Sequence, residues 1–293
     1  MCPGLKLIHK AKPLFLVGAP RSGTTLLNGI LNSHPDILLT NETAVFLQLN
    51  EMISKSYKGV QSGILYGKQE HELWAEYLES RAREMIQDYY GKIATKEGRS
   101  KLFYWGEKHP HLFLCLDWIQ KHFPEAIYIY IVRDPRDSAC SISAMNKVSH
   151  RKSLTNIFNF TRKYENFATQ LPENRLINVR YEDMVGDYSG VTQKILDKLC
   201  LPRTPEVDRF IEKYKDVDSH KIRAFRLIRR NFKDISLGRW KKEMNQEDAL
   251  FADQELGSYL EKYDYERSGY VEETPPQATF LRNIKDRIAH HLP

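Results

Sequence analysis

The residues best suited to chemistry lie in one short stretch near the start of the chain, where a cation and several hydroxyl groups stand within and directly after a loop bounded by two glycines. An apolar run at 14–17 precedes the stretch, and a helical pattern through Ile30 and Leu31 follows it, which is typical of strand, loop and helix. Glycines let the backbone approach an oxyanion closely, and the N–H groups at a helix start point towards it. The sequence therefore predicts an anion-binding loop that contains Gly18, Arg21, Ser22, Gly23, Thr24 and Thr25.

The spacing of this loop is close to that of a nucleoside triphosphate-binding loop and departs from it at one position. Gly18 and Gly23 have the G-x-x-x-x-G spacing, but Thr24 stands where triphosphatases place the lysine that reaches the β- and γ-phosphates. A loop that holds a single 5′-phosphate does not need that lysine. The alternative is an ordinary Gly–Thr turn, which the convergence of four polar loop residues disfavours.

A second cluster follows the most apolar, β-branched run of the sequence. Arg133 comes directly after that run, and Ser141 lies eight residues further on, on the second turn of the expected helix. An arginine fork suits a phosphate, and Ser141 can face the same anion. The alternative is that Arg133 and Arg136 pair with Asp134 and Asp137 at the surface.

With Arg21 inside the loop, residues 19–27 resemble the 5′-phosphosulfate loop of sulfotransferases that use PAPS (3′-phosphoadenosine 5′-phosphosulfate), most closely the bacterial and tyrosylprotein branch. The resemblance implies that Arg133 and Ser141 bind the 3′-phosphate, which ATP lacks. It also implies that the product nucleotide is PAP (adenosine 3′,5′-bisphosphate).

Residues 107–110, Glu-Lys-His-Pro, resemble the Glu-Lys-Thr-Pro signature of the same branch, with His109 in place of Thr. The resemblance implies that Lys108 contacts the sulfuryl group during transfer. It further implies that Tyr181 lies near the adenine and that a late Gly-x-Trp-Lys segment closes over the nucleotide, although Tyr181 and Trp240 also suit a plain core. The resemblance therefore adds Tyr181, Trp240 and Lys241 to the expected nucleotide-binding residues, beside the loop residues, Arg133 and Ser141.

The implied reaction moves a trigonal sulfuryl group in line from a phosphate to an acceptor oxygen. Cations such as Arg21 and Lys108 would stabilise the charge that develops on the leaving phosphate, and no metal is required because that group carries one phosphate. The acceptor hydroxyl or phenol needs a base. Glu42, just past the second expected strand, matches the base of this branch, and His109 is the rival.

These residues must be positioned by a sheet. Apolar runs alternate with helical patterns, which predicts an α/β fold with a doubly wound parallel β-sheet. The resemblance implies that its P-loop-like loop binds phosphosulfate and that residues 1–293 are one sulfotransferase domain. Within it we expect a helical insertion over 45–100 that covers or shapes the acceptor site, and a C-terminal tail over 274–293. The expected strands are 14–17, 37–40, 103–105, 126–132 and 175–181.

The composition sets the outer limits. The chain has 293 residues, 41% of them hydrophobic and 28% charged, and a net charge of +6, which favours an anionic ligand without implying nucleic acid. Four separated cysteines form no Cys-x-x-Cys pair. No apolar run is long enough to span a bilayer and no secretory signal is visible, so we expect a cytoplasmic protein.

Two other functions compete with PAPS-dependent transfer to a hydroxyl or phenol. The first is a P-loop small-molecule kinase or nucleotide-binding enzyme, which the missing loop lysine disfavours. The second is a module that binds polyanions through the basic face around Arg226. The acceptor itself is left open: a small molecule, a sugar, a lipid or a peptide tyrosine all fit.

Overall fold

A five-stranded parallel sheet forms the centre of the computed structural model, which describes residues 3–61, 68–215 and 237–270. The strands run in the order β2-β3-β1-β4-β5, and all their pairings are parallel. This confirms the predicted doubly wound α/β fold. The strands are β1 (Lys12–Gly18), β2 (Ile37–Asn41), β3 (Tyr104–Lys108), β4 (Ile127–Val132) and β5 (Leu176–Arg180).

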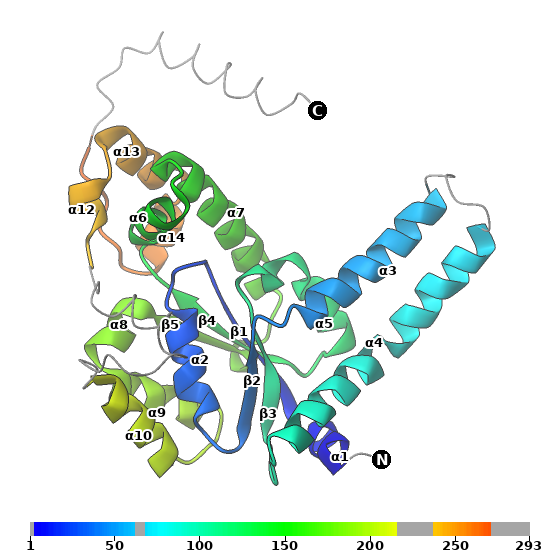
Figure 1. Cartoon of the computed structure of the whole chain (residues 1–293). Helices are drawn as coiled ribbons and strands as arrows, with labels where there is room; N and C mark the ends of the chain where they lie inside the picture. Colours follow the sequence, from blue (N-terminus) through cyan, green and yellow to red (C-terminus); the bar gives the residue numbers. More distant parts are fainter. Residues whose placement is uncertain (1–2, 62–67, 216–236, 271–293) are drawn as a thin grey trace.

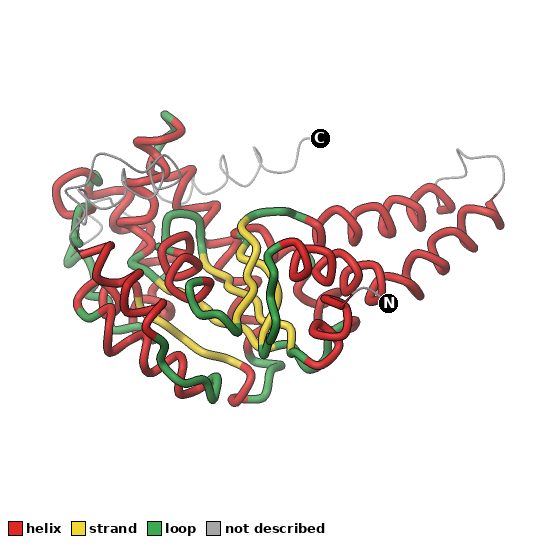
Figure 2. The backbone as a smooth tube through the Cα atoms, turned by 60° about the horizontal axis from the view of Figure 1, so that its bottom comes forward, coloured by secondary structure: helices red, strands yellow, loops and turns green. Residues whose placement is uncertain are grey.

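Helices cover both faces of the sheet, so the inner strands are buried on both sides (Figures 1 and 2). On one face, Leu14 and Ile129 pack with four helices: α2 (Thr24–Asn32), α8 (Tyr181–Gly186), α9 (Tyr188–Lys198) and α10 (Pro205–Lys215). On the other face, Phe15 and Tyr128 belong to a larger core. The elements on that larger face are α1 (Pro3–Lys10), α3 (Val45–Gln61), α4 (Lys68–Lys96), the short 3-10 helix η1 (Pro110–Leu114), α5 (Leu116–His122), α6 (Pro135–Asn146), α7 (His150–Ala168), α12 (Trp240–Glu243), α13 (Gln246–Glu255) and α14 (Gly257–Lys262).

The expected helical insertion is present as a long antiparallel pair, α3 and α4, that projects from the rest of the molecule (Figure 2). Its aromatic residues divide between two environments. Tyr90 is fully buried beside Trp105 in the core, whereas Trp74 and Tyr77 stack on each other at the surface. The insertion therefore packs on the sheet at its base and exposes aromatic rings further out.

The structure differs from the sequence predictions at several boundaries. The third strand extends to Lys108, because Glu107 pairs with Thr40 of β2 on one side and Phe15 of β1 on the other. Pairing on both sides overrides the low strand propensity of charged residues. The stretch between β3 and β4 forms two helices, η1 and α5, and α1 was not predicted. The basic stretch around Arg226 and the tail 274–293 lie outside the described residues.

Candidate active site

The candidate site lies at the edge of the sheet where the parallel strands end, the usual location of ligand crevices in such folds. The loop after β1, the turn after β4 and the segment after β2 meet there. Because β3 and β4 flank β1, the residues Lys108 and Arg133 at their ends lie on either side of the loop that starts at Gly18.

The loop between β1 and α2 has the backbone that its glycines predict. Gly23 has φ of +94°, and a Cβ added there would lie 2.4 Å from the ring of Tyr181. Arg21 also has a left-handed φ of 70°, a conformation that costs a residue with a side chain roughly 1–3 kcal/mol. Such strain at a non-glycine residue in a loop of this kind is common at ligand-binding sites.

The structure joins two predicted clusters. The Nε of Arg21 donates a hydrogen bond to Ser141 Oγ at 3.0 Å, and a guanidinium nitrogen of Arg133 donates to the backbone carbonyl of Arg21 at 2.8 Å. The guanidinium of Arg133 also lies over the ring of Tyr181, 4.4 Å from its centroid. Arg21, Arg133, Ser141 and Tyr181 thus form one group, which we call the guanidinium cluster.

The electrostatics of this cluster suit an anion. Burial lowers the pKa of Arg21, and the nearby positive charges of Arg133 and Arg239 lower it further. The hydroxyl of Ser22 and the Nε of Arg133 are buried and have no hydrogen-bond partner among the residues that the structure describes. Converging like charges and buried donors of this kind are stabilised when a phosphate lies between them.

A second group, the lysine cluster, lies at the end of β3. The Nζ of Lys108 is 2.5 Å from Glu42 Oε1 and donates to Thr25 Oγ1 at 3.2 Å. Lys108 is fully buried, while the side chain of Glu42 is 47% exposed. Burial lowers the pKa of Lys108, and the carboxylate of Glu42 raises it in part. The predicted base and the predicted sulfuryl-contacting lysine are therefore direct partners.

His109 is placed close to this cluster but with its basic nitrogen in use. Its Nδ1 accepts the backbone N–H of His111 at 3.0 Å and so caps η1. Burial lowers the pKa of His109, which favours the neutral ring, and the proton of that ring then sits on Nε2. In this geometry Nε2 can donate a hydrogen bond and cannot accept a proton.

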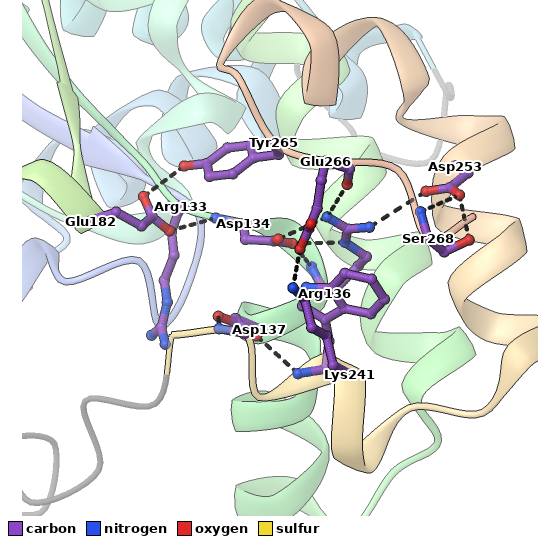
Figure 3. Close-up of polar contacts among 12 residues, drawn as sticks. Arg133, Asp134, Arg136, Asp137, Glu182, Lys241, Asp253, Tyr265, Glu266 and Ser268 are labelled. Atoms are coloured by element: carbon purple, nitrogen blue, oxygen red, sulfur yellow. Dashed lines mark hydrogen bonds and ion pairs between the residues drawn. The ribbon is translucent and has the colours of Figure 1, made fainter. Parts of the chain in front are cut away.

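The late segment is fixed to the turn after β4 (Figure 3). Asp137 accepts the backbone N–H groups of Gly238 and Trp240 at 2.8 and 3.0 Å. Arg136, fully buried, lies 3.7 Å from the ring centroid of Trp240 and is paired with Asp134. This arrangement supports the core alternative for Trp240.

Lys241 pairs with Glu266 inside the same C-terminal region. Two residues at the site were not among the predicted site residues. The positive charge of Arg239 lowers the pKa of Arg21, and its position one residue before Trp240 was the signal in the sequence. Glu107 was given no role beyond its place in the Glu-Lys-His-Pro stretch, but it is a fully buried carboxylate, and burial of such a group is costly without hydrogen-bond partners.

The described ranges contain neither a metal-ligand cluster nor a helix suited to a membrane. Within residues 3–61, 68–215 and 237–270, no three His, Cys, Asp or Glu side chains gather in the manner of a metal site. Over the same ranges, no helix combines the length and the apolar character that crossing a bilayer requires.

The parallel sheet and the loop after β1 define an α/β protein with a phosphate-type loop. Comparison with known proteins identifies the family within this class. The profile of the Sulfotransferase family matches residues 13–206, which is most of the chain. The chain therefore belongs to the sulfotransferase family.

Named relatives agree with this assignment. Protein-tyrosine sulfotransferase 1 of Danio rerio is 32% identical over 192 residues, 61% of this chain and 50% of the relative. The Homo sapiens protein of that name is 34% identical over 158 residues, 50% of this chain and 40% of the relative. The chain thus spans about half, or less, of the length of these relatives.

Among solved structures, the sulfotransferase domain from the curacin biosynthetic pathway has a TM-score of 0.54 at 19% identity and covers 87% of this chain and 98% of its own. A mouse sulfotransferase in complex with PAP has a TM-score of 0.53 at 15% identity and covers 89% of this chain and 90% of its own. At these identities the likeness shows the shared fold.

Proposed function

We propose that this protein transfers the sulfuryl group of PAPS to a hydroxyl or phenol acceptor. The observation that carries the proposal is the guanidinium cluster: Arg21, Arg133 and Ser141 converge beside a phosphate-type loop. A nucleotide with a second phosphate on its 3′-oxygen has an anion to place there, and ATP has none. The likeness in fold to a PAP-complexed sulfotransferase supports this donor.

The residues present fit such a nucleotide. The backbone of the loop 18–23 and the first turn of α2, with Ser22, Thr24 and Thr25, would hold the 5′-phosphosulfate, since N–H groups and hydroxyls converge there. Arg133 and Ser141 would hold the 3′-phosphate as charge-assisted donors. Tyr181, under Arg133 and against Gly23, would border the adenosine. Arg239 adds positive charge to the same region.

When bound, PAPS supplies an activated sulfuryl group with PAP as its leaving group. Lys108 would place its ammonium beside the oxygen on which negative charge develops, in a buried position where that interaction is strong. The Glu42 carboxylate would accept the acceptor hydroxyl proton while the acceptor oxygen bonds to sulfur and the bond from sulfur to the phosphate oxygen breaks. Glu42 is preferred to His109 because the Nδ1 of that ring is already occupied.

The names of two relatives support a phenol as acceptor. Both are protein-tyrosine sulfotransferases, so a phenol, either in a peptide or as a small molecule, is the first acceptor to try. Sugar hydroxyls come next, because Glu42 can serve as base for either.

Calorimetry with PAP against ATP–Mg²⁺ tests the donor. We expect PAP to bind without metal and more tightly than ATP–Mg²⁺; the reverse order would favour a kinase. Incubation with PAPS carrying labelled sulfate, and a panel of tyrosine peptides, phenols and sugars, then tests transfer. PAP binding with no transfer to any acceptor would indicate a nucleotide-binding module.

A further inference from the structure

We propose that Glu107 is a positioning residue that holds the loop 42–44 so that the carboxylate of Glu42 faces Lys108. This rests on the proposed function, in which Glu42 is the base. Glu107 is outside the predicted site residues, and within the described part of the chain its carboxylate accepts hydrogen bonds from Thr43 and Ala44 and not from Lys108 or Thr25.

The argument begins with the two faces of β3. Side chains alternate along a strand, and Trp105 lies in the core beneath α3 and α4 while Tyr104 lies in the core beneath α2. Glu107 shares the face of Trp105, and Lys108 shares the other face, where it contacts Thr25 of α2. The two neighbouring charged residues therefore serve opposite sides of the sheet.

The segment after β2 is attached to both of these residues. The backbone N–H of Glu42 donates to the carbonyl of Lys108 at 2.9 Å, and its carboxylate meets the Nζ of the same lysine. One residue later, Thr43 Oγ1 donates to Glu107 Oε1 at 2.8 Å, and the backbone N–H of Ala44 donates to the same oxygen at 2.7 Å. The chain is therefore fixed to β3 twice: at Glu42 by Lys108, and at Thr43 and Ala44 by Glu107.

The backbone of this segment needs such anchors. Glu42 and Ala44 have φ of 56° and 60°, left-handed conformations that side chains with a Cβ rarely adopt. Two such residues on either side of Thr43 persist only where surrounding contacts fix them. The carboxylate of Glu107 provides two of those contacts with one oxygen.

Glu107 is buried, and one of its carboxylate oxygens carries all of its hydrogen bonds among the described residues. The side chain is fully buried, and its second oxygen, Oε2, has no hydrogen-bond partner among the described residues. Burial raises the pKa of Glu107, while the bonds from Thr43 and Ala44 lower it in part. Burying a carboxyl group costs free energy, and the hydrogen bonds from Thr43 and Ala44 offset part of that cost.

The test compares Glu107→Ala with Glu107→Gln. The amide oxygen of the second variant can still accept from Thr43 and Ala44, so we expect it to keep most of the activity. Glu107→Ala should lower kcat by about 10²-fold, as misplacement of a reacting group does, with KM for PAPS and affinity for PAP unchanged. Equal losses in both variants, or an unchanged kcat in Glu107→Ala, would overturn the proposal.

Three further variants keep the test decisive. Adding Ala44→Gly to Glu107→Ala should restore part of kcat, because glycine adopts positive φ freely. Thr43→Val, which removes one donor, should lower kcat even if Glu107→Ala fails to fold, and no effect would contradict the inference. The matched control is Asp248→Asn. Asp248 is a buried residue of α13 whose carboxylate accepts a hydrogen bond from Arg151 of α7, so this variant should lower stability and leave kcat unchanged.

Hydrogen exchange at the Ala44 amide separates this inference from the proposed function. In Glu107→Ala that amide loses its acceptor and should exchange faster than in the unchanged protein. If the unchanged protein transfers no sulfate, the proposed function is wrong, yet the exchange experiment still decides whether Glu107 holds the loop. Unchanged exchange would mean that it does not.

Discussion

Arg21 and Ser141 are joined by a hydrogen bond of 3.0 Å although 120 residues separate them in the chain. The sequence assigned Arg21 to the sulfuryl end of the donor and Ser141 to the 3′-phosphate end. In the structure the guanidinium of Arg21 extends towards Ser141, while its backbone carbonyl accepts from Arg133. The loop arginine therefore links both predicted binding regions, and kinetics must decide which one it serves.

We expect Arg21→Ala and Lys108→Ala each to lower kcat by about 10²-fold or more, because each removes a cation from the developing negative charge. Initial rates and PAP calorimetry on the same preparations measure this. If Arg21→Ala instead weakens PAP binding and leaves kcat unchanged, Arg21 belongs to the 3′-phosphate.

Arg133→Ala should weaken binding of PAP far more than binding of adenosine 5′-monophosphate, which lacks the 3′-phosphate. The physical reason is that a charge-assisted bond to that phosphate contributes only when the phosphate is present. Calorimetry with both nucleotides measures the difference, and Ser141→Ala should show the same preference more weakly. Equal losses for the two ligands would remove Arg133 from this role.

Glu42→Gln should abolish turnover and leave PAP affinity intact at neutral pH. It should also change how PAP binding depends on pH. Burial lowers the pKa of Lys108 and Glu42 partly restores it, so removal of that carboxylate lowers the lysine pKa further. PAP affinity should then decline at a lower pH than in the unchanged protein, measured by calorimetry across alkaline buffers. If PAP binding has the same pH dependence in both proteins, Lys108 does not contribute to binding of the nucleotide.

Glu107 should make stability depend on pH. Because burial raises its pKa above the ordinary 4.5, the folded protein holds this proton more tightly than the unfolded chain. Its stabilising contribution is therefore complete below pH 4.5 and is lost as pH rises through the raised pKa. Urea unfolding at several pH values should show the unchanged protein losing stability relative to Glu107→Gln over that window. If the stability difference between the unchanged protein and Glu107→Gln is the same at every pH, the pKa of Glu107 is not raised.

The thiols should differ in reactivity. Burial raises the pKa of Cys115 and of Cys140 to about 12, whereas Cys200 is exposed. Since the thiolate is the reactive form, native protein at pH 8 should label at Cys200 and leave the two buried thiols unmodified until it is unfolded. Mass spectrometry of the labelled peptides reads this directly.

The sequence predicted the sheet well because its central strands are continuous apolar runs and its loop has glycines at fixed spacing. It also placed Glu42 just past the carboxyl end of the second strand, where the structure has it. The contact between Glu42 and Lys108 depends on the pairing of β2 with β3, which the sequence did not predict. The sequence also could not predict that the third strand extends through Lys108, because pairing of Glu107 with two neighbours is a tertiary effect.

The side-chain details were equally hidden. That His109 uses Nδ1 to cap a 3-10 helix depends on the backbone of His111, and that Trp240 lies under Arg136 depends on contacts about a hundred residues apart. The Arg21–Ser141 bond follows from the register of β1 and β4, which spacing along the chain does not encode. Their roles in binding and catalysis stay predictions.

The fixing of the late segment to the turn after β4 bears on where this chain can be cut. The profile match ends at residue 206, yet Arg136 and Asp137 take partners from residues 238–266. A fragment that ends at residue 206 would lack the segment that covers Arg136. The guanidinium of Arg136, which is fully buried in the whole protein and lies three residues after Arg133, would then be exposed. We therefore expect the smallest piece of this protein that folds independently to extend beyond residue 206 and to include the segment 238–266.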